Sequence, residues 1–133
     1  MIKYQILAIA AAGATLVPLT ALALDLNSFR AQHGRPVLSI STTLSGAAYA
    51  HANDMARRKS LDHKGFRRRM SFVSSAAAEN VAFGCDTEDC AIRMWAKSSG
   101  HRANMLRDDV TSYGIASATA DNGRRYWVLE LGN

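Results

Sequence analysis

The strongest constraint on the fold of this chain is the pattern near its C-terminal end. Residues 113–120 and 125–131 have the composition of β-strands, and Asp121, Asn122 and Gly123 separate them. An Asn-Gly pair between two such runs is a strong signal for a tight β-hairpin. Residues 126–129 read Tyr-Trp-Val-Leu, which is too apolar for an exposed sheet, so we expect helices to cover this hairpin.

Helical patterns precede the hairpin. The longest is expected from about residue 42 to residue 59, with Ser41, Thr42 or Thr43 as its cap and apolar or small side chains at helical spacing. His51 lies on this buried stripe, and we favour a hydrogen-bonded core histidine over a ligand there. Shorter helices are expected at 25–32, 87–95 and 102–106. Helices followed by a terminal hairpin predict an α+β fold with helices packed on an antiparallel sheet.

The first 23 residues resemble a secretory signal. Lys3 precedes an apolar run of 12 residues, Ile6 to Val17, and Ala21-Leu22-Ala23 is a small-x-small cleavage signal. The run is shorter than the ~20 apolar residues that a membrane-spanning helix needs, so we expect cleavage rather than a transmembrane anchor. The sequence thus predicts a signal peptide at 1–23 and one domain at 24–133.

The two cysteines, Cys85 and Cys90, both lie in the predicted domain. An exported chain meets an oxidising compartment, which favours a disulfide. Free thiols are the alternative. A metal pair is disfavoured because no CxxC spacing or nearby histidine completes a ligand set.

Positive charge is concentrated at residues 57–69. Without Lys3 the chain has 15 Lys and Arg against 11 Asp and Glu, a net charge of +4, and seven of these cations lie in this stretch. Such a cluster can attract anionic polymers or lipid headgroups. No aromatic residues alternate with it, so we expect no nucleic-acid binding. A solvated basic loop is the simpler interpretation.

Two further residues carry candidate chemistry. With Ser98 as N-cap, His101 lies in the first turn of a helix, where the helix dipole favours the neutral imidazole that binds metals or accepts protons. Glu79 lies among small apolar residues, and burial raises the pKa of a carboxyl group unless a cation or a donor meets it. A structural role, in which Glu79 caps backbone N–H groups, stays open.

A series of short motifs runs along the predicted domain. They are Leu26-Asn-Ser-Phe-Arg30, Ala47-Ala-x-Ala-His-Ala-x-Asp-Met55, Leu61-Asp-His63, Ala78-Glu-Asn-Val-Ala82, Trp95-x-x-Ser-x-Gly-His-Arg-x-Asn-Met-Leu106, Tyr113-Gly-Ile115 and Tyr126-Trp127. In this order they resemble the CAP superfamily of cysteine-rich secretory, antigen five and pathogenesis-related one proteins, and most of all its short bacterial, SCP-like members, over nearly the whole predicted domain. The resemblance implies an α–β–α sandwich, with a small antiparallel sheet between helical layers.

The resemblance also implies a cavity with two histidines and two acidic residues, which in some members binds a divalent metal. His63, Glu79 and His101 match three of these groups, whereas the second glutamate has no match and Ser98 stands nearest to it. Two imidazoles and a carboxylate suit Zn²⁺, with His63 and His101 as the metal ligands. The alternative is that these side chains bond to one another and to the backbone, fixing the loops.

Three functions follow as hypotheses for a secreted or periplasmic, monomeric protein. The favoured one is a binding module that holds a metal, a small ligand or an envelope polymer without catalysis, because no nucleophile elbow surrounds Ser98. The second is a metal-dependent hydrolase with Glu79 as general base. The third is envelope attachment through the basic cluster at 57–69.

Overall fold

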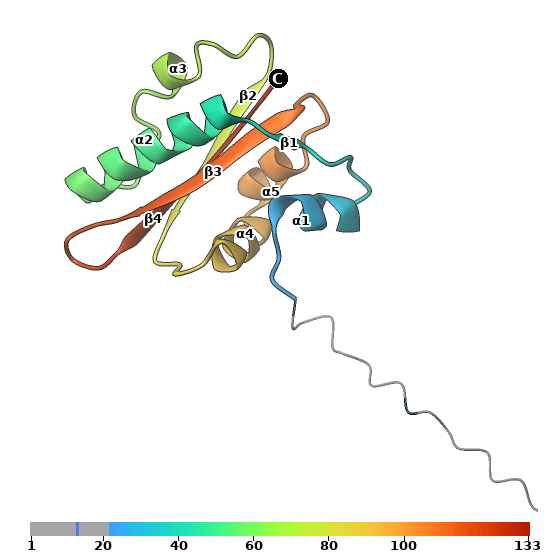
Figure 1. Cartoon of the computed structure of the whole chain (residues 1–133), viewed down its shortest axis with the longest axis horizontal. Helices are drawn as coiled ribbons and strands as arrows, with labels where there is room; N and C mark the ends of the chain where they lie inside the picture. The colour runs from blue at the N-terminus through green and yellow to red at the C-terminus, as the bar shows by residue number, and fades with distance from the viewer. Residues whose placement is uncertain (1–12, 14–21) are drawn as a thin grey trace, which may run out of the picture.

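The computed structural model describes residues 22–133 together with Gly13, so the predicted signal peptide at 1–23 lies almost wholly outside the described residues. Within the described part, no helix is both long and apolar enough to cross a membrane. Five helices and four strands follow one another along residues 26–132 (Figure 1). In chain order they are α1 (Leu26–Gln32), β1 (Ser39–Ile40), α2 (Thr42–Arg58), α3 (Phe66–Arg69), β2 (Ala77–Phe83), α4 (Glu88–Ala96), α5 (Ser99–Met105), β3 (Ser112–Thr119) and β4 (Arg125–Gly132).

The four strands form one sheet in the order β1-β3-β4-β2. The predicted C-terminal hairpin is confirmed: β3 and β4 pair antiparallel, and Gly123 takes a positive φ of 83° in the turn between them. β2 adds to the other side of β4, also antiparallel, whereas the two-residue β1 runs parallel to β3. The sheet is therefore antiparallel apart from a short edge.

Helices cover both faces of this sheet, as expected for an α–β–α sandwich. α2 and the short α3 lie on one side, and α1, α4 and α5 lie on the other (Figure 1). Because successive side chains of a strand point to opposite faces, Val128 packs with α2 residues such as Met55, and Leu129 packs with Trp95 of α4. The α+β prediction is confirmed.

The helix starts follow from local hydrogen bonds. The side chain of Ser41 accepts from the Leu44 N–H at 3.2 Å, and that of Thr87 accepts from the Cys90 N–H at 3.2 Å. Each side chain satisfies a backbone donor that the first turn of a helix leaves free. The predicted helix from residue 42 therefore begins at one of its expected caps.

The packing of α2 on β3 is unusually close at Gly114. A Cβ added there would lie 2.1 Å from the backbone nitrogen of Ser45. No side chain larger than hydrogen fits at this crossing, which lets α2 lie directly on the strand.

The predicted disulfide is also present. Cys85, after β2, is bonded to Cys90 in α4, with the two Cα atoms 5.5 Å apart. Cys85 is buried, and its carbonyl accepts a hydrogen bond from the indole N–H of Trp127 at 2.8 Å. The bond ties the end of β2 to the start of α4.

Candidate functional site

The contact at the centre of the site joins Glu79 of β2 to His63, which lies in the loop between α2 and α3. His63 Nδ1–H donates to Glu79 Oε1 at 2.7 Å. The Glu79 side chain is 1% exposed, whereas that of His63 is 54% exposed. The carboxylate is thus a buried anchor, and the imidazole is the member of the pair that reaches solvent.

Arg69, the last residue of α3, binds the other oxygen of Glu79. Its Nε donates to Glu79 Oε2 at 3.0 Å, and its Nη2 donates to the same oxygen. Its Nη1 donates to the carbonyl of Lys64 at 3.0 Å, which closes the loop in front of α3. Both oxygens of Glu79 therefore have partners, one an imidazole and one a guanidinium.

A second buried carboxyl group belongs to Glu130 of β4, which is the cross-strand partner of Glu79 on the neighbouring strand. Arg69 Nε also donates to Glu130 Oε1 at 2.9 Å, whereas Glu130 Oε2 is buried without a hydrogen-bond partner among the described residues. Burial, reinforced by the neighbouring Glu79 carboxylate, raises the pKa of Glu130 to about 10. At neutral pH this group is therefore a neutral acid.

Glu79 itself stays ionised. Burial alone favours its protonated form, but the neighbouring Glu130 carboxyl, Arg69 and His63 outweigh that effect and lower the pKa of Glu79 below its ordinary value. The pair thus holds one proton, on Glu130, and one negative charge, on Glu79, which faces Arg69.

His51 approaches the same carboxylate from α2 but has another partner. Its Nε2–H donates to the carbonyl of Asp62 at 2.7 Å, and the same nitrogen lies 3.8 Å from Glu79 Oε1. His51 is buried. The prediction of a hydrogen-bonded core histidine is confirmed.

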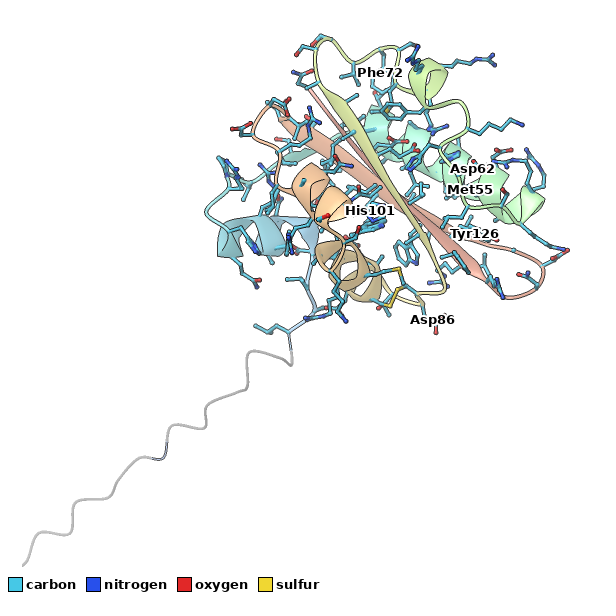
Figure 2. All side chains as sticks on the ribbon, turned by 180° about the vertical axis from the view of Figure 1, so that it is seen from behind. Met55, Asp62, Phe72, Asp86, His101 and Tyr126 are labelled. Carbon is cyan, nitrogen blue, oxygen red and sulfur yellow. A yellow bond between two sulfur atoms is a disulfide. The ribbon has the colours of Figure 1, made fainter. Side chains whose placement is uncertain are left out.

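His101 lies in α5, on the far side of β2 from Asp62 and the end of α2 (Figure 2), and Ser98 directly precedes α5. Ser98 is the N-cap residue, although its side chain makes no capping hydrogen bond within residues 22–133. The backbone carbonyl of His101 accepts from Asn80 Nδ2 at 3.0 Å. Burial, followed by positive charge on His63, lowers the pKa of His101 below 6.5. The neutral imidazole was expected from the helix end, whereas burial and the charge of His63 are the causes of the lowered pKa.

Asn104 completes the link between α5 and β2. Its Nδ2 donates to Asn80 Oδ1 at 2.9 Å and lies 3.5 Å from the carbonyl of Glu79. Together with the bond from Asn80 to the His101 carbonyl, these contacts fix α5 beside the strand that carries the buried carboxylate.

One pocket opens at this position, which we call the His63 pocket. Its volume is about 260 Å³. Arg107 on its rim is held by Asp109 through contacts of 2.8 and 2.6 Å. His101 and Ser98 are not among the residues that line it. The residues that line the pocket are His63, Phe66, Ala77, Ala78, Glu79, Asn104 and Arg107.

Glu79 has no oxygen without a hydrogen-bond partner to offer a divalent metal. Residues 22–133 contain no group of three or more His, Cys, Asp or Glu side chains placed to hold an ion. Arg69 already supplies the positive charge that faces Glu79 and Glu130. A metal at Glu79 would have to displace both this guanidinium and the His63 N–H.

The basic cluster at 57–69 is largely paired. Arg58 contacts Asp54 and Asp62, at 2.7 and 2.8 Å, and Lys59 contacts Asp121 at 2.8 Å. Arg57 also contacts Asp54, and the Arg69 side chain, 11% exposed, lies against the carboxyl groups. Within the part of the chain that the structure describes, the three remaining cations have no ion-pair partner. They are Lys64, Arg67 and Arg68.

Two residues of this site carry no individual role in the sequence-based prediction. In that prediction Arg69 is only one member of an exposed basic cluster, and Glu130 is only one residue of an apolar strand. A signal for Glu130 exists: it is the one charged residue between Tyr126 and Leu131, in a strand whose other members are apolar. A charge at a position that should be buried indicates a buried partner of opposite charge.

Comparison with known proteins shows which sequences and structures this chain is similar to. Residues 25–131 match the pattern of the cysteine-rich secretory protein family, CAP. The chain is 34% identical over 97 residues to the uncharacterized protein YkwD of Bacillus subtilis (strain 168), a match that covers 67% of this chain and 38% of that protein. The chain thus spans well under half the length of this relative.

Solved structures share the fold. An outer surface protein from Borrelia burgdorferi superposes with a TM-score of 0.72 at 18% identity, covering 81% of this chain and 86% of that one. An extracellular protein containing a SCP domain from Bacillus anthracis str. Ames superposes with a TM-score of 0.67 at 22% identity, covering 81% of this chain and 37% of that one.

Proposed function

Because this chain belongs to the cysteine-rich secretory protein (CAP) family, we propose that it is an exported, non-catalytic binding protein whose His63 pocket takes up a small anionic ligand. Export is supported by the apolar stretch at Ile6–Val17 and by the fold shared with proteins described as extracellular or outer-surface. Binding rather than catalysis is supported by the state of Glu79.

The observation that carries this proposal is that both oxygens of Glu79 are already engaged. A general base needs a free oxygen within reach of the proton that it removes. Glu79 is 6% exposed, with His63 on one oxygen and Arg69 on the other. The hydrolase hypothesis requires Glu79 to release one of these partners, and the binding hypothesis requires no such change.

Charge supports an anionic ligand. The pocket presents the ring of His63 and the guanidinium of Arg107, which also pairs with Asp109 outside the pocket lining, and its one acidic lining residue, Glu79, faces inward to Arg69. Lys64, just before α3, and Arg67 and Arg68, within it, have no ion-pair partner in the described part of the chain and add to the positive potential nearby. Such a potential raises the local concentration of anions. Only these three of the seven cations at 57–69 lack a partner in the described residues, so the envelope-attachment hypothesis has less support than seven unpaired cations would give it.

The test is an NMR titration of the protein purified after export, with succinate as the probe. We expect millimolar binding (about 1 mM for a ligand of eight heavy atoms) and shifts of the His63, Ala77 and Arg107 amides. Arg107→Gln should weaken binding about fivefold. The matched control is Arg57→Gln, which removes a charge that lines a different pocket.

The proposal would be overturned if succinate caused no shifts at the amides of the His63 pocket. It would also be overturned if the uncharged analogue succinamide caused the same shifts as succinate. Metal analysis of the same sample tests the Zn²⁺ hypothesis. Stoichiometric metal that disappears in the His63→Ala/His101→Ala variant would favour metal binding instead.

A further inference from the structure

β2 is an edge strand, and every second residue of it turns its backbone polar groups away from the sheet. Among the described residues it has β4 on one side and no strand on the other. The N–H of Gly84, just after β2, donates to the carbonyl of Arg125 at 3.1 Å. In an antiparallel ladder hydrogen-bonded pairs alternate with pairs that are not bonded to each other. The even-numbered residues therefore bond to β4, and the odd-numbered ones face outward.

Two outward carbonyls of β2 agree with this assignment and are already covered. The indole N–H of Trp95 donates to the carbonyl of Val81 at 3.0 Å, and Asn104 Nδ2 lies 3.5 Å from the carbonyl of Glu79. α4 and α5 thus close the C-terminal half of this edge. Within residues 22–133, the N-terminal half has no such cover at Ala77.

The outward N–H groups of Ala77 and Glu79 have no hydrogen-bond partner among the described residues. These donors, with the carbonyl of Ala77, lie where the His63 pocket opens, between His63 and Phe66 on one side and Arg107 on the other. Unpaired groups of an edge strand are a template for another extended chain.

The surroundings of this edge favour an acidic chain. Arg107 lines the pocket, and Lys64, Arg67 and Arg68 lie in and beside α3 without an ion-pair partner in residues 22–133. Phe66 supplies an apolar wall. Charge complementarity of this kind mainly sets which partner binds and how fast it associates.

We propose that the free N-terminal half of the β2 edge binds an extended acidic peptide, which pairs its backbone with Ala77 and Glu79 while its carboxylates face Arg107 and the cations of α3. The proposal rests on the proposed function, since it places the peptide in the same pocket. It adds that recognition proceeds through the backbone at strand spacing, about 3.3 Å per residue.

The probe is an acetylated and amidated hexapeptide of alternating Glu and Val, titrated into the ¹⁵N-labelled protein purified after export. We expect shifts and slowed hydrogen exchange at the Ala77 and Glu79 amides. Two further peptides carry N-methyl groups on the three Glu residues or on the three Val residues. Only one of these sets faces β2, so one N-methylated peptide should lose about tenfold or more in affinity and the other should bind as before.

A protein variant tests the same contact from the other side. Ala77→Pro removes one outward N–H at the first residue of an edge strand, where proline is tolerated, and should weaken hexapeptide binding. If this variant does not fold, as judged by circular dichroism, the N-methylated peptides still test the proposal on the unchanged protein. A Lys-Val hexapeptide should bind at least tenfold more weakly.

Two results would overturn strand pairing: no binding of the Glu-Val hexapeptide, or equal affinities for all three peptides. If succinate still shifts the His63 and Arg107 amides in that case, the anionic pocket stands and only the peptide proposal is wrong. If neither succinate nor the hexapeptide binds, both proposals are wrong.

Discussion

Glu79 and Glu130 are cross-strand partners on β2 and β4, and Arg69 Nε donates to a carboxyl oxygen of each. Two carboxyl groups and one guanidinium thus share a buried space on the α2 side of the sheet. One proton and one negative charge reside on the pair, so the guanidinium is balanced without a second anion. This balance leads to two predictions about stability.

The first prediction concerns Glu130→Gln. The folded pKa of Glu130 is about 10, far above its ordinary value of 4.5, so its contribution to stability is complete below about pH 4.5 and is lost as the pH rises toward 10. Glutamine does not ionise. The stability of Glu130→Gln relative to wild type should therefore rise by about 1 kcal/mol or more between about pH 5 and pH 8. Urea denaturation at each pH measures it, and parallel curves would contradict the prediction.

The second prediction concerns Glu79→Gln. The variant removes the carboxylate that faces Arg69, and Glu130, which also accepts from Arg69, must give up its proton in a buried position to replace that charge. This should cost about 1.5–3 kcal/mol of unfolding free energy at pH 7. The control, Asp54→Asn, removes a carboxylate from its more exposed ion pairs with Arg57 and Arg58 and should cost about 1 kcal/mol or less. Because the folded pKa of Glu79 is lowered, the wild-type advantage is present above pH 4.5 and disappears as the pH falls below it. Equal costs for the two variants would contradict it.

The third prediction concerns the titration of His101. Burial and then the charge of His63 lower its pKa below 6.5. His63→Gln removes the second cause, so the NMR titration midpoint of the His101 ring should move upward. His33→Gln, at the end of α1, is the matched control and should leave that midpoint unchanged. An unchanged midpoint in His63→Gln would show that His63 does not act on His101.

The fourth prediction concerns the disulfide. Replacing Cys85 and Cys90 by alanine opens a loop with a sequence separation of 5, which in the chain-entropy description costs about 2 kcal/mol. Neither cysteine lines the His63 pocket, so the loss should appear as a lower urea midpoint with succinate binding retained. A variant as stable as wild type would show that the loop is ordered without the bond.

The sequence predicted the elements that depend on local signals. Ser41 and Thr87 are short-range caps, and the Asn122-Gly123 turn is a short-range hairpin signal, so α2, α4 and the β3–β4 hairpin were expected close to their observed bounds. β1 has only two residues, and β2 carries Glu79 and Asn80 in its middle. Neither segment has a strand pattern of its own in the sequence. Both are strands because they pair with neighbouring strands of the sheet.

The site was less predictable because its partners lie far apart in sequence. His63 and Glu79 were expected together only through the family resemblance. The contact between Arg69 and Glu130 spans 61 residues, and nothing near Arg69 in the sequence distinguishes it from Arg67 or Arg68. α3 lies in a stretch for which the sequence predicts a solvated loop. The hydrogen bond of Arg69 to Glu79 accounts for the position of this helix.

The hydrogen-only side chain of Gly114 has a consequence far from its own strand. Ser45 rests on it near the beginning of α2, while the other end of that helix leads into the loop that carries His63. Because an added methyl group at position 114 would collide with the backbone of α2, we expect Gly114→Ala to displace this helix. The loop that carries His63 follows α2 directly, so the substitution should alter the pocket although no residue that lines it is replaced.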